Sequence, residues 1–288
     1  MMLRAGSTPP LNITMWRPFR RGLPPARKVF RLALAAASFA CLLISVSFVA
    51  HTQTPQAARG VIRLKVKYKS GDVTKELPRK RFFLISGSTD QNKALIETIK
   101  QTEVTSRECY YRNHGASDAL IRWLNENDCE SFYCRAIEDR YISGSEAVPE
   151  FKVAYDQALR DLKAPEVARR WLPNYLAPVI RDGYYTSKQQ TISNLVKQAE
   201  TATAKPVMSI MTDRKGTAYL TDIDPGVYTI SNLVGSETDK SSILWVCERE
   251  VKATDLTIAM KRPFILSNEK DPKVKCEVIE RPLPVCGR

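Results

Sequence analysis

The sequence predicts an α+β fold in which an antiparallel β-sandwich is interrupted by a mainly helical insertion. Three observations lead to this prediction. Apolar and charged residues alternate over residues 61–69, which is the period of a half-buried strand. From residue 89 to residue 203 the spacing of apolar residues is helical. At Pro206 the period returns to two, and several short segments follow that are separated by turn residues.

The first two strands precede the helical block. In residues 61–69 the apolar side chains share one face of the strand and the basic side chains share the other. The apolar face consists of Ile62, Leu64, Val66 and Tyr68, and the basic face of Arg63, Lys65, Lys67 and Lys69. Residues 70–72 predict a turn, and residues 81–85 predict a second strand. Because two strands cannot bury an apolar face alone, they require partners from elsewhere in the chain.

Local signals mark helix starts in the middle of the chain. Ser88 with Gln91, and Thr186 with Gln189, match the capping box, in which two side chains satisfy free amide groups at the start of a helix. Together with the helical spacing, these signals predict a helical, cysteine-containing insertion over residues 87–204.

The strands that follow the insertion complete the predicted sandwich. We expect strands at residues 207–211, 217–222, 226–233, 243–251 and 256–261. The sandwich domain then consists of residues 61–86 together with residues 205–261. Residues 262–288 are rich in proline and lysine, contain two cysteines, and are interpreted as a tail.

A motif in these later strands resembles a known family. Residues 212–220 read Thr-Asp-Arg-Lys-Gly-Thr-Ala-Tyr-Leu, and residues 223–230 read Ile-Asp-Pro-Gly-Val-Tyr-Thr-Ile. A strand ending in Thr-Asp, a tight turn to Gly, a strand, and then Pro-Gly-x-Tyr is similar to the pattern of the carboxypeptidase regulatory-like domain. This resemblance implies a transthyretin-like, prealbumin-type β-sandwich that acts as an accessory or adhesive module, separate from any catalytic zinc domain. The helical insertion departs from the compact pattern of that family.

The N-terminal segment predicts export. Residues 17–31 are basic, and the run that begins at Leu32 and ends at Ala50 is 19 residues without a charge. This layout is typical of a signal peptide over residues 1–52. The alternative is an uncleaved membrane anchor, because a run of this length just crosses the apolar core of a bilayer. In either case we expect the body of the chain to be secreted, periplasmic or part of the cell envelope.

The positive charge of the chain is concentrated in the same segment. The chain has 44 Lys and Arg residues against 31 Asp and Glu residues, which gives a formal charge of +13. Seven of the basic residues and no acidic residue lie within residues 1–31, so the remaining 37 basic residues face 31 acidic ones and the body carries only +6. This balance does not indicate a general nucleic-acid-binding protein.

Removal of the leader leaves six cysteines. They are Cys109, Cys129, Cys134, Cys247, Cys276 and Cys286. An even number in an exported chain predicts disulfides. Zinc is the alternative, but the body has a single histidine and no Cys-x-x-Cys motif. Three of the six lie in the insertion and three beyond it, so full pairing requires an odd number of bridges between the two groups.

The spacing of the cysteines suggests a connectivity. Within the insertion we expect Cys109 to pair with Cys129 or Cys134, because two cysteines five residues apart diverge on one helix. We expect Cys247 to pair with a tail cysteine, and the remaining tail cysteine to reach the insertion.

Few residues are candidates for catalysis. His114 is the single histidine after residue 52, so a hydrolase would combine it with Ser117 and Glu126. Ser117 is interpreted more simply as the N-cap of the helix that follows it. Zinc sites with two or three histidines are excluded, and the sequence has no glycine-rich phosphate loop. We therefore predict no catalytic residues, no metal site and no cofactor.

The acidic residues near the insertion cysteines are interpreted as a solvated surface paired with arginines. They are Glu126, Asp128, Glu130, Glu138 and Asp139.

The most distinctive predicted surface is basic. The basic face of the first strand is followed by a second basic group at the start of the next strand. Together these residues are Arg63, Lys65, Lys67, Lys69, Arg79, Lys80 and Arg81. Such a surface can bind an anionic polymer. The alternative is that lysines on an exposed strand prevent edge-to-edge pairing.

The function predicted from the sequence is an exported, non-catalytic binding or structural module. The sandwich is the scaffold, and the disulfide-stabilised insertion presents a surface for a protein partner or an anionic envelope polymer. Specific nucleic-acid binding is not predicted, and membrane contact requires an uncleaved leader. The alternatives are a hydrolase with its site in the insertion and a membrane-anchored component of envelope assembly.

Overall fold

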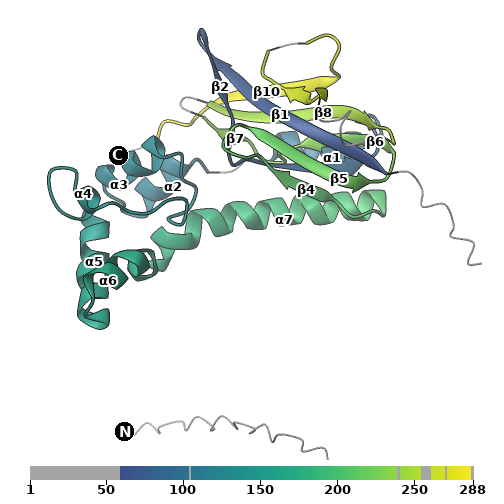
Figure 1. Cartoon of the computed structure of the whole chain (residues 1–288). Helices are drawn as coiled ribbons and strands as arrows, with labels where there is room; N and C mark the ends of the chain where they lie inside the picture. The colour runs from purple at the N-terminus through teal and green to yellow at the C-terminus, as the bar shows by residue number, and fades with distance from the viewer. Residues whose placement is uncertain (1–58, 104, 239–240, 254–260, 270, 287–288) are drawn as a thin grey trace, which may run out of the picture. The chain divides into compact units, whose positions relative to one another are not determined.

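A computed structural model describes residues 59–103, 105–238, 241–253, 261–269 and 271–286 of the chain (Figure 1). Two β-sheets and seven α-helices are formed within these ranges, and no helix among them is long and apolar enough to cross a bilayer. The predicted α+β class, a β-sandwich combined with a helical region, is confirmed. The predicted leader lies outside the described residues, and so do residues 256–260 of the last predicted strand.

The smaller sheet is built around β1 (Gly60–Ser70). This strand pairs antiparallel with β2 (Val73–Glu76) and β5 (Thr217–Ile223), and parallel with β9 (Phe264–Leu266). Strands from before and after the helical segment therefore share one sheet. The strand β9 comes from residues 262–288, so this segment is part of the sandwich rather than a separate tail.

The larger sheet has six strands. In spatial order they are β10 (Cys276–Pro282), β8 (Ser241–Val251), β6 (Gly226–Ser231), β3 (Arg81–Ser86) and β4 (Met208–Met211), with β7 (Ser236–Glu237) also paired to β8. All of these pairings are antiparallel, so the strand β3 from before the helices lies between two strands from after them.

The core of the sandwich lies between the two sheets. The alternation in β1 places Leu64 and Val66 on the inner face, where both are fully buried. They belong to the same apolar cluster as Phe82 and Trp245 of the larger sheet, whose rings meet edge to face at 5.9 Å. The predicted apolar face of the first strand is thus the face that packs against the second sheet.

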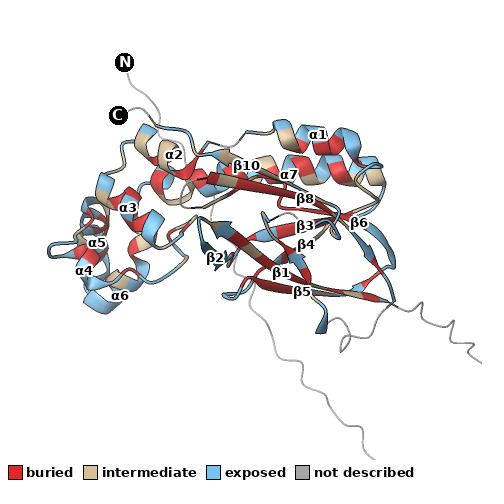
Figure 2. Cartoon of the chain, turned by 90° about the horizontal axis from the view of Figure 1, so that it is seen from above, coloured by how far each residue is buried: buried red, intermediate tan, exposed pale blue. Residues whose placement is uncertain are grey.

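A third layer covers the outer face of the larger sheet (Figure 2). The residues Phe83 and Ile85 of β3 point to this face and pack against helices α1 (Lys93–Gln101) and α7 (Tyr184–Thr203). The strand is apolar on both faces because both faces are covered. The first and last helices of the predicted insertion therefore belong to the sandwich.

The two predicted capping boxes have different outcomes. The amide of Ser88 donates to Oε1 of Gln91 at 2.8 Å, and the amide of Gln91 donates to Oγ of Ser88 at 3.2 Å, which is the reciprocal pattern expected just before α1. The second prediction is wrong, because Thr186 and Gln189 lie inside α7. That helix continues directly from a π-helical turn at Val179–Gly183 and needs no cap there.

Residues 107–183 form a separate helical lobe with a core of its own. Its helices are α2 (Arg107–Asn113), α3 (Asp118–Glu126), α4 (Asp139–Ile142), α5 (Pro149–Leu162) and α6 (Pro165–Trp171). The centre of the core is Trp123, which is stacked on Phe132 at 5.9 Å and edge-on to Phe151 at 4.9 Å. Aromatic side chains bury a large apolar area each, so a few of them hold these short helices together.

Candidate functional site

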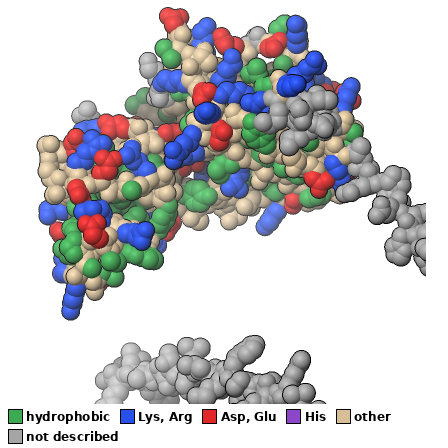
Figure 3. Space-filling view, in the orientation of Figure 1, with side chains coloured by type: hydrophobic (Ala, Val, Ile, Leu, Met, Phe, Trp, Pro, Cys, Tyr) green, Lys and Arg blue, Asp and Glu red, His purple; other side chains and the backbone are tan. Residues whose placement is uncertain are grey.

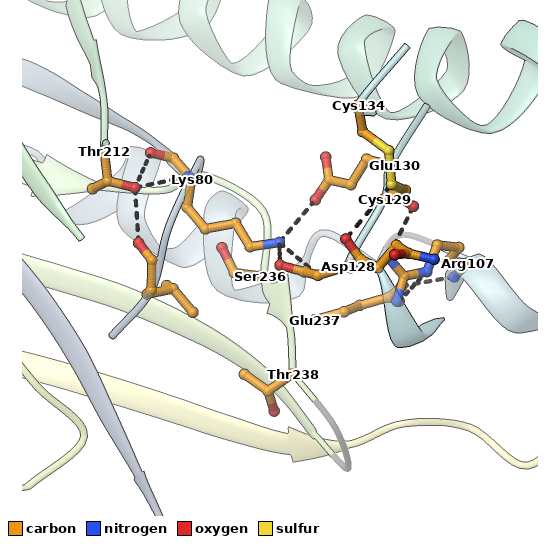
Figure 4. A network of polar contacts seen from close by, with 12 residues as sticks. Lys80, Arg107, Asp128, Cys129, Glu130, Cys134, Thr212, Ser236, Glu237 and Thr238 are labelled. Atoms are coloured by element: carbon orange, nitrogen blue, oxygen red, sulfur yellow. Dashed lines mark hydrogen bonds and ion pairs between the residues drawn. A yellow bond between two sulfur atoms is a disulfide. The ribbon is translucent and has the colours of Figure 1, made fainter. Parts of the chain in front are cut away.

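Six charged side chains meet where the helical lobe adjoins the sandwich, and Figure 4 labels five of them. They are Lys80, Arg107, Asp128, Glu130, Lys188 and Glu237, which we call the interface network. Three are cations and three are carboxylates, so the formal charges balance. The residues come from the start of β3, the loop after α3, helices α2 and α7, and strand β7. The network thus connects the lobe to the larger sheet and to the outer helical layer.

Hydrogen bonds of the Thr212 hydroxyl hold Lys80 immediately before β3. Its amide donates to Oγ1 of Thr212 at 2.9 Å, and the Thr212 hydroxyl donates to the carbonyl of Leu77 at 2.8 Å. The residue is only 5% exposed, and its ammonium nitrogen lies 3.1 Å from the carboxylate of Asp128 and 3.6 Å from that of Glu130. An isolated buried ammonium is costly, so these two carboxylates stabilise the charge on Lys80.

Glu130 is shared by two ammonium groups. Its Oε1 lies 2.8 Å from Nζ of Lys188 and 3.6 Å from Nζ of Lys80. Burial raises the pKa of Glu130, but the two cations outweigh this effect and lower the pKa to about 2. The carboxylate is therefore ionised at neutral pH and has no proton to donate as a general acid.

Arg107 ties α2 to the loop that follows α3. Its guanidinium donates to the carbonyl of Cys129 and to Oδ1 of Asn125, both at 3.0 Å, and lies 3.7 Å from the carboxylate of Asp128. The residue is buried, and these bonds replace part of the water that its guanidinium would otherwise bind.

Glu237 connects the lobe to β7. Its Oε1 accepts a hydrogen bond from the amide of Arg107 at 2.7 Å and another from the hydroxyl of Tyr184 at 3.1 Å. Burial and the adjacent Glu237 carboxylate raise the pKa of Tyr184 well above its usual value of 10. The Tyr184 hydroxyl therefore keeps its proton and remains a hydrogen-bond donor at neutral pH.

The six cysteines of the described chain form three disulfides. These are Cys109–Cys286, Cys129–Cys134 and Cys247–Cys276. The first joins α2 of the lobe to the segment that follows β10, so one bridge connects the two groups of three, as their parity requires. The third joins β8 to β10, in agreement with the expected pairing of Cys247 with a cysteine from residues 262–288.

The expected pairing within the helical region is wrong. Cys129 pairs with Cys134 and not with Cys109, and the two Cα atoms are 5.7 Å apart. The expectation assumed one helix through both residues, but α3 ends at Glu126 and the chain then turns back on itself. The bridge closes a short loop that contains Glu130, so it holds this carboxylate facing the lysines of the sandwich.

Three cavities border the interface network. The first, of about 160 Å³, is lined by Lys80 and Lys188, and the second, of about 430 Å³, by Arg107 and Glu237. The third, of about 250 Å³, lies beside Tyr184, Lys188 and Glu237. Because the charges at their walls are already paired, the arrangement is suited to fixing the orientation of the lobe.

The described residues contain no group of three His, Cys, Asp or Glu side chains that could hold a metal ion. Their cysteines are all disulfide-bonded and are therefore not available as thiolate ligands.

The basic residues singled out in the sequence separate into two groups. Four of them, Arg63, Lys65, Lys67 and Lys69, lie along β1 on the outer face of the smaller sheet. Figure 3 shows basic side chains over this sheet with acidic ones among them. The guanidinium of Arg63 lies over the ring of Tyr219 at 5.5 Å, Lys65 pairs with Glu76, and Lys69 pairs with Glu269 at 3.3 Å.

The other three basic residues do not extend this surface. Lys80 is part of the interface network, and Arg79 donates to the carbonyl of Cys134 at 3.0 Å, so both join the sandwich to the lobe. Arg81 is exposed at the first position of β3.

The residues of the hydrolase alternative have other partners. The imidazole Nδ1 of His114 lies 2.7 Å from the carbonyl of Tyr110, on whose ring it stacks. The Ser117 hydroxyl accepts from the amide of Leu120 at 3.1 Å, as an N-cap does, and donates to a carboxylate oxygen of Glu150 at 2.7 Å. Ser117 therefore has the structural role that its sequence context predicts.

The sequence did not reveal most of the interface network. Asp128 and Glu130 were interpreted as solvated acids, but Glu130 is a partly buried partner of two lysines. Their position on either side of Cys129 is the only local signal, because a bridged cysteine restrains its neighbours. Arg107, Lys188 and Glu237 stand in ordinary helical and strand contexts that carry no such signal.

No protein-family model and no curated protein sequence matches this chain. Among solved structures, the chain is similar to the pilus backbone (RrgB) from Streptococcus pneumoniae, with 12% sequence identity and a TM-score of 0.23. The similarity covers 74% of this chain and 41% of that chain, so the chain spans less than half the length of that protein. A similarity of this extent does not establish a shared fold.

Proposed function

We propose that the chain is an exported, non-catalytic module in which a β-sandwich holds a helical lobe in a fixed orientation for binding to a partner. The observation that carries this proposal is the Cys109–Cys286 disulfide, which joins the lobe to the end of the sandwich across 177 residues of sequence. Disulfides of this kind persist in oxidising compartments, and the predicted leader at residues 1–52 supports the same destination.

The detailed family of the sandwich is also part of this proposal. In the turn that resembles the carboxypeptidase regulatory-like pattern, Oδ1 of Asp213 accepts from the amides of Lys215 and Thr217 at 2.8 and 2.9 Å. Later in the motif, the Tyr228 hydroxyl donates to the carbonyl of Asp224 at 2.8 Å. These residues act on turns and strands rather than on a substrate, which supports a scaffold role for the motif.

The proposed surface for a protein partner is the outer side of the lobe. Trp171 at the end of α6 is 51% exposed, and Val153 and Val167 are also exposed on α5 and α6. In Figure 3, apolar side chains gather over this end of the molecule. Tryptophan contributes strongly to binding when a partner covers it. We expect Trp171→Ala to reduce capture of a partner from the exported fraction, and Met211→Ala, an equally exposed residue of the sandwich, to leave capture unchanged.

The alternative partner is an anionic envelope polymer bound to the outer face of the smaller sheet. A double change of Arg63 and Lys67 to Gln is expected to weaken binding to an acidic polysaccharide and to flatten its salt dependence. The matched control changes Lys93 and Lys197, which are exposed on the helical layer, and removes the same charge. Equal losses for the two variants would indicate a nonspecific charge effect and would contradict this assignment.

The export proposal is tested on the protein isolated from its native host. We expect a mature chain without residues 1–52 and without free thiols, in which peptide mapping without reduction finds the Cys109–Cys286 bridge. Recovery of the protein from the reducing cytoplasm with free thiols would contradict the proposal.

A further inference from the structure

The segment that follows β10 forms a strap between the sandwich and the lobe. Residues 283–286, which we call the strap, leave the sheet and end at Cys286, which is bonded to Cys109 of α2. Leu283 and Pro284 line both the cavity of about 430 Å³ and the cavity of about 250 Å³. The strap is therefore a wall that these two cavities share.

The strap disulfide differs from the other two in its access to solvent. Both Cys109 and Cys286 are partly exposed, whereas each of the other bridges contains a cysteine that is fully buried, Cys129 in one and Cys247 in the other. Thiol–disulfide exchange requires a thiolate to approach a sulfur atom, so access limits its rate. The strap disulfide is thus the bridge that a reductant reaches from either side.

The three bridges also differ in how far their cysteines can separate once they are reduced. Cys247 and Cys276 stand opposite each other on paired strands, and Cys129 and Cys134 are five residues apart, so both pairs stay close together when reduced. Beyond its bridge the strap has weak contacts. The sulfur atom of Cys286 lies 3.9 Å from Oγ of Ser106, and that of Cys109 lies 3.8 Å from the carbonyl oxygen of Pro284. Val285 is fully exposed. A reduced Cys286 can therefore move away from Cys109.

We propose that the Cys109–Cys286 bridge is a site of thiol–disulfide exchange with a dithiol reductant, and that its reduction releases the strap from the lobe. A thiolate of the reductant attacks one sulfur of the bridge, and the other cysteine leaves as a thiolate and takes up a proton. The second thiol of the reductant then attacks the mixed disulfide. The reductant leaves as a disulfide, and Cys109 and Cys286 each gain one electron and one proton.

Release of the strap changes the cavities at the interface network. Both spaces beside Arg107 and Glu237 already open to solvent, and with one shared wall removed they merge into a single wider space. The Cys129–Cys134 and Cys247–Cys276 bridges remain closed, so the carboxylate loop and the β8–β10 pairing stay in place. Reduction therefore exposes a polar groove between the lobe and the sandwich without unfolding either.

The first test measures the order of reduction. The folded protein is treated with limiting dithiothreitol, alkylated at intervals and mapped by mass spectrometry. We expect Cys109 and Cys286 to be labelled at least about tenfold faster than the other four cysteines, because access limits exchange. Labelling of either other pair at the same rate or faster would overturn the proposal.

The second test measures the consequence by hydrogen exchange. The protein in which only the Cys109–Cys286 bridge is reduced and the Cys109→Ser/Cys286→Ser variant are each compared with the oxidised protein. If the variant folds poorly, the reduced natural chain still gives the measurement. We expect faster exchange in residues 283–286 and in α2, with β1, β3 and β10 unchanged. Unchanged exchange in the strap would overturn the proposed release. Faster exchange throughout the sandwich would show that the bridge is a structural staple instead.

Discussion

The sandwich and the helical lobe are stabilised in different ways. The sandwich distributes its core over two sheets and a helical layer, and each strand contributes alternating side chains to it. The lobe has short helices around a few aromatic rings centred on Trp123, and its position depends on the Cys109–Cys286 bridge and the interface network. The sandwich is therefore specified by a repeated pattern, whereas the lobe is specified by individual residues.

The largest expected effects come from removing one tryptophan in each region. We expect Trp245→Ala and Trp123→Ala each to lower the free energy of unfolding by about 3–5 kcal/mol, because both side chains are fully buried. Trp245 lies between the sheets, so its loss should destabilise the whole body. Trp123 packs only within the lobe core, so its loss should release the lobe while the sheets stay folded.

Hydrogen exchange with peptide-level resolution distinguishes these two outcomes. In the Trp123→Ala variant, amides of α3 and α5 should lose protection while those of β3 and β8 keep it. If both variants lose protection everywhere to the same extent, the lobe and the sandwich unfold as one unit and the proposed contrast between them is wrong.

The fold could be predicted where the sequence repeats a pattern. The alternation in β1 identified its buried face, and the returning period after Pro206 identified β4, β5, β6 and β8. The strands β9 and β10 were missed, because neither shows a clear period in the sequence. The pairing of β9 is parallel and only three residues long, and β10 is an edge strand in which charged residues interrupt the apolar ones. The helices α1 and α7 were recognised as helices, but no local signal assigned them to the sheet rather than to the lobe.

The candidate site could be predicted only in part. The number of cysteines predicted a bridge between the helical region and the end of the chain. Each group contains three cysteines, and an odd number cannot be paired within its own group, whatever the geometry. The partner of Cys129 depends on where α3 ends, which no signal in the sequence marks. The interface network unites residues far apart in sequence, such as Lys80 and Lys188, and no periodic pattern records such a contact.

An intermediate effect is expected from the interface network. Glu130→Gln removes the carboxylate that Lys80 and Lys188 share and leaves two buried ammonium groups with less compensation. The pKa of Glu130 is lowered from 4.5 to about 2 in the folded protein. A carboxyl group whose pKa is lower in the folded protein than in the unfolded chain stabilises the fold at pH values above the unfolded pKa. This stabilisation disappears as the pH falls toward the folded pKa. Glu130→Gln should therefore lower the free energy of unfolding at neutral pH by at most about 3 kcal/mol.

The sign of this pH dependence makes the prediction specific. The difference in unfolding free energy between the natural chain and Glu130→Gln should be largest near about pH 7 and should shrink between about pH 5 and about pH 2. Urea unfolding at several pH values measures it. Glu126→Gln, which removes an exposed acid from the same region, is the control and should show no such convergence. A difference that stays constant with pH would mean that Glu130 does not bind the lysines as described.

The smallest expected effects come from two serines whose hydroxyls accept from backbone amides, one on the turn before α1 and one at the N-cap of α3. Ser88→Ala removes the acceptor of the Gln91 amide before α1, at an exposed site, and should cost about 0.5–1 kcal/mol. Ser117→Ala removes the cap of α3 and also the hydroxyl that donates to Glu150 of α5. It should therefore cost more, about 1–2 kcal/mol, because one side chain serves both a helix end and a contact between helices.

Comparison of these two caps tests how strongly the lobe depends on single residues. Chemical unfolding of both variants gives the costs, and Ser117→Thr, which retains a hydroxyl, should recover most of the loss in the lobe. Ser88→Thr is the matched change before α1 and should behave like the natural chain. Because the Ser117 hydroxyl serves two contacts and the Ser88 hydroxyl serves one, the ratio of the two alanine costs should exceed one. Equal costs would mean that Glu150 gains nothing from the Ser117 hydroxyl beyond what water provides.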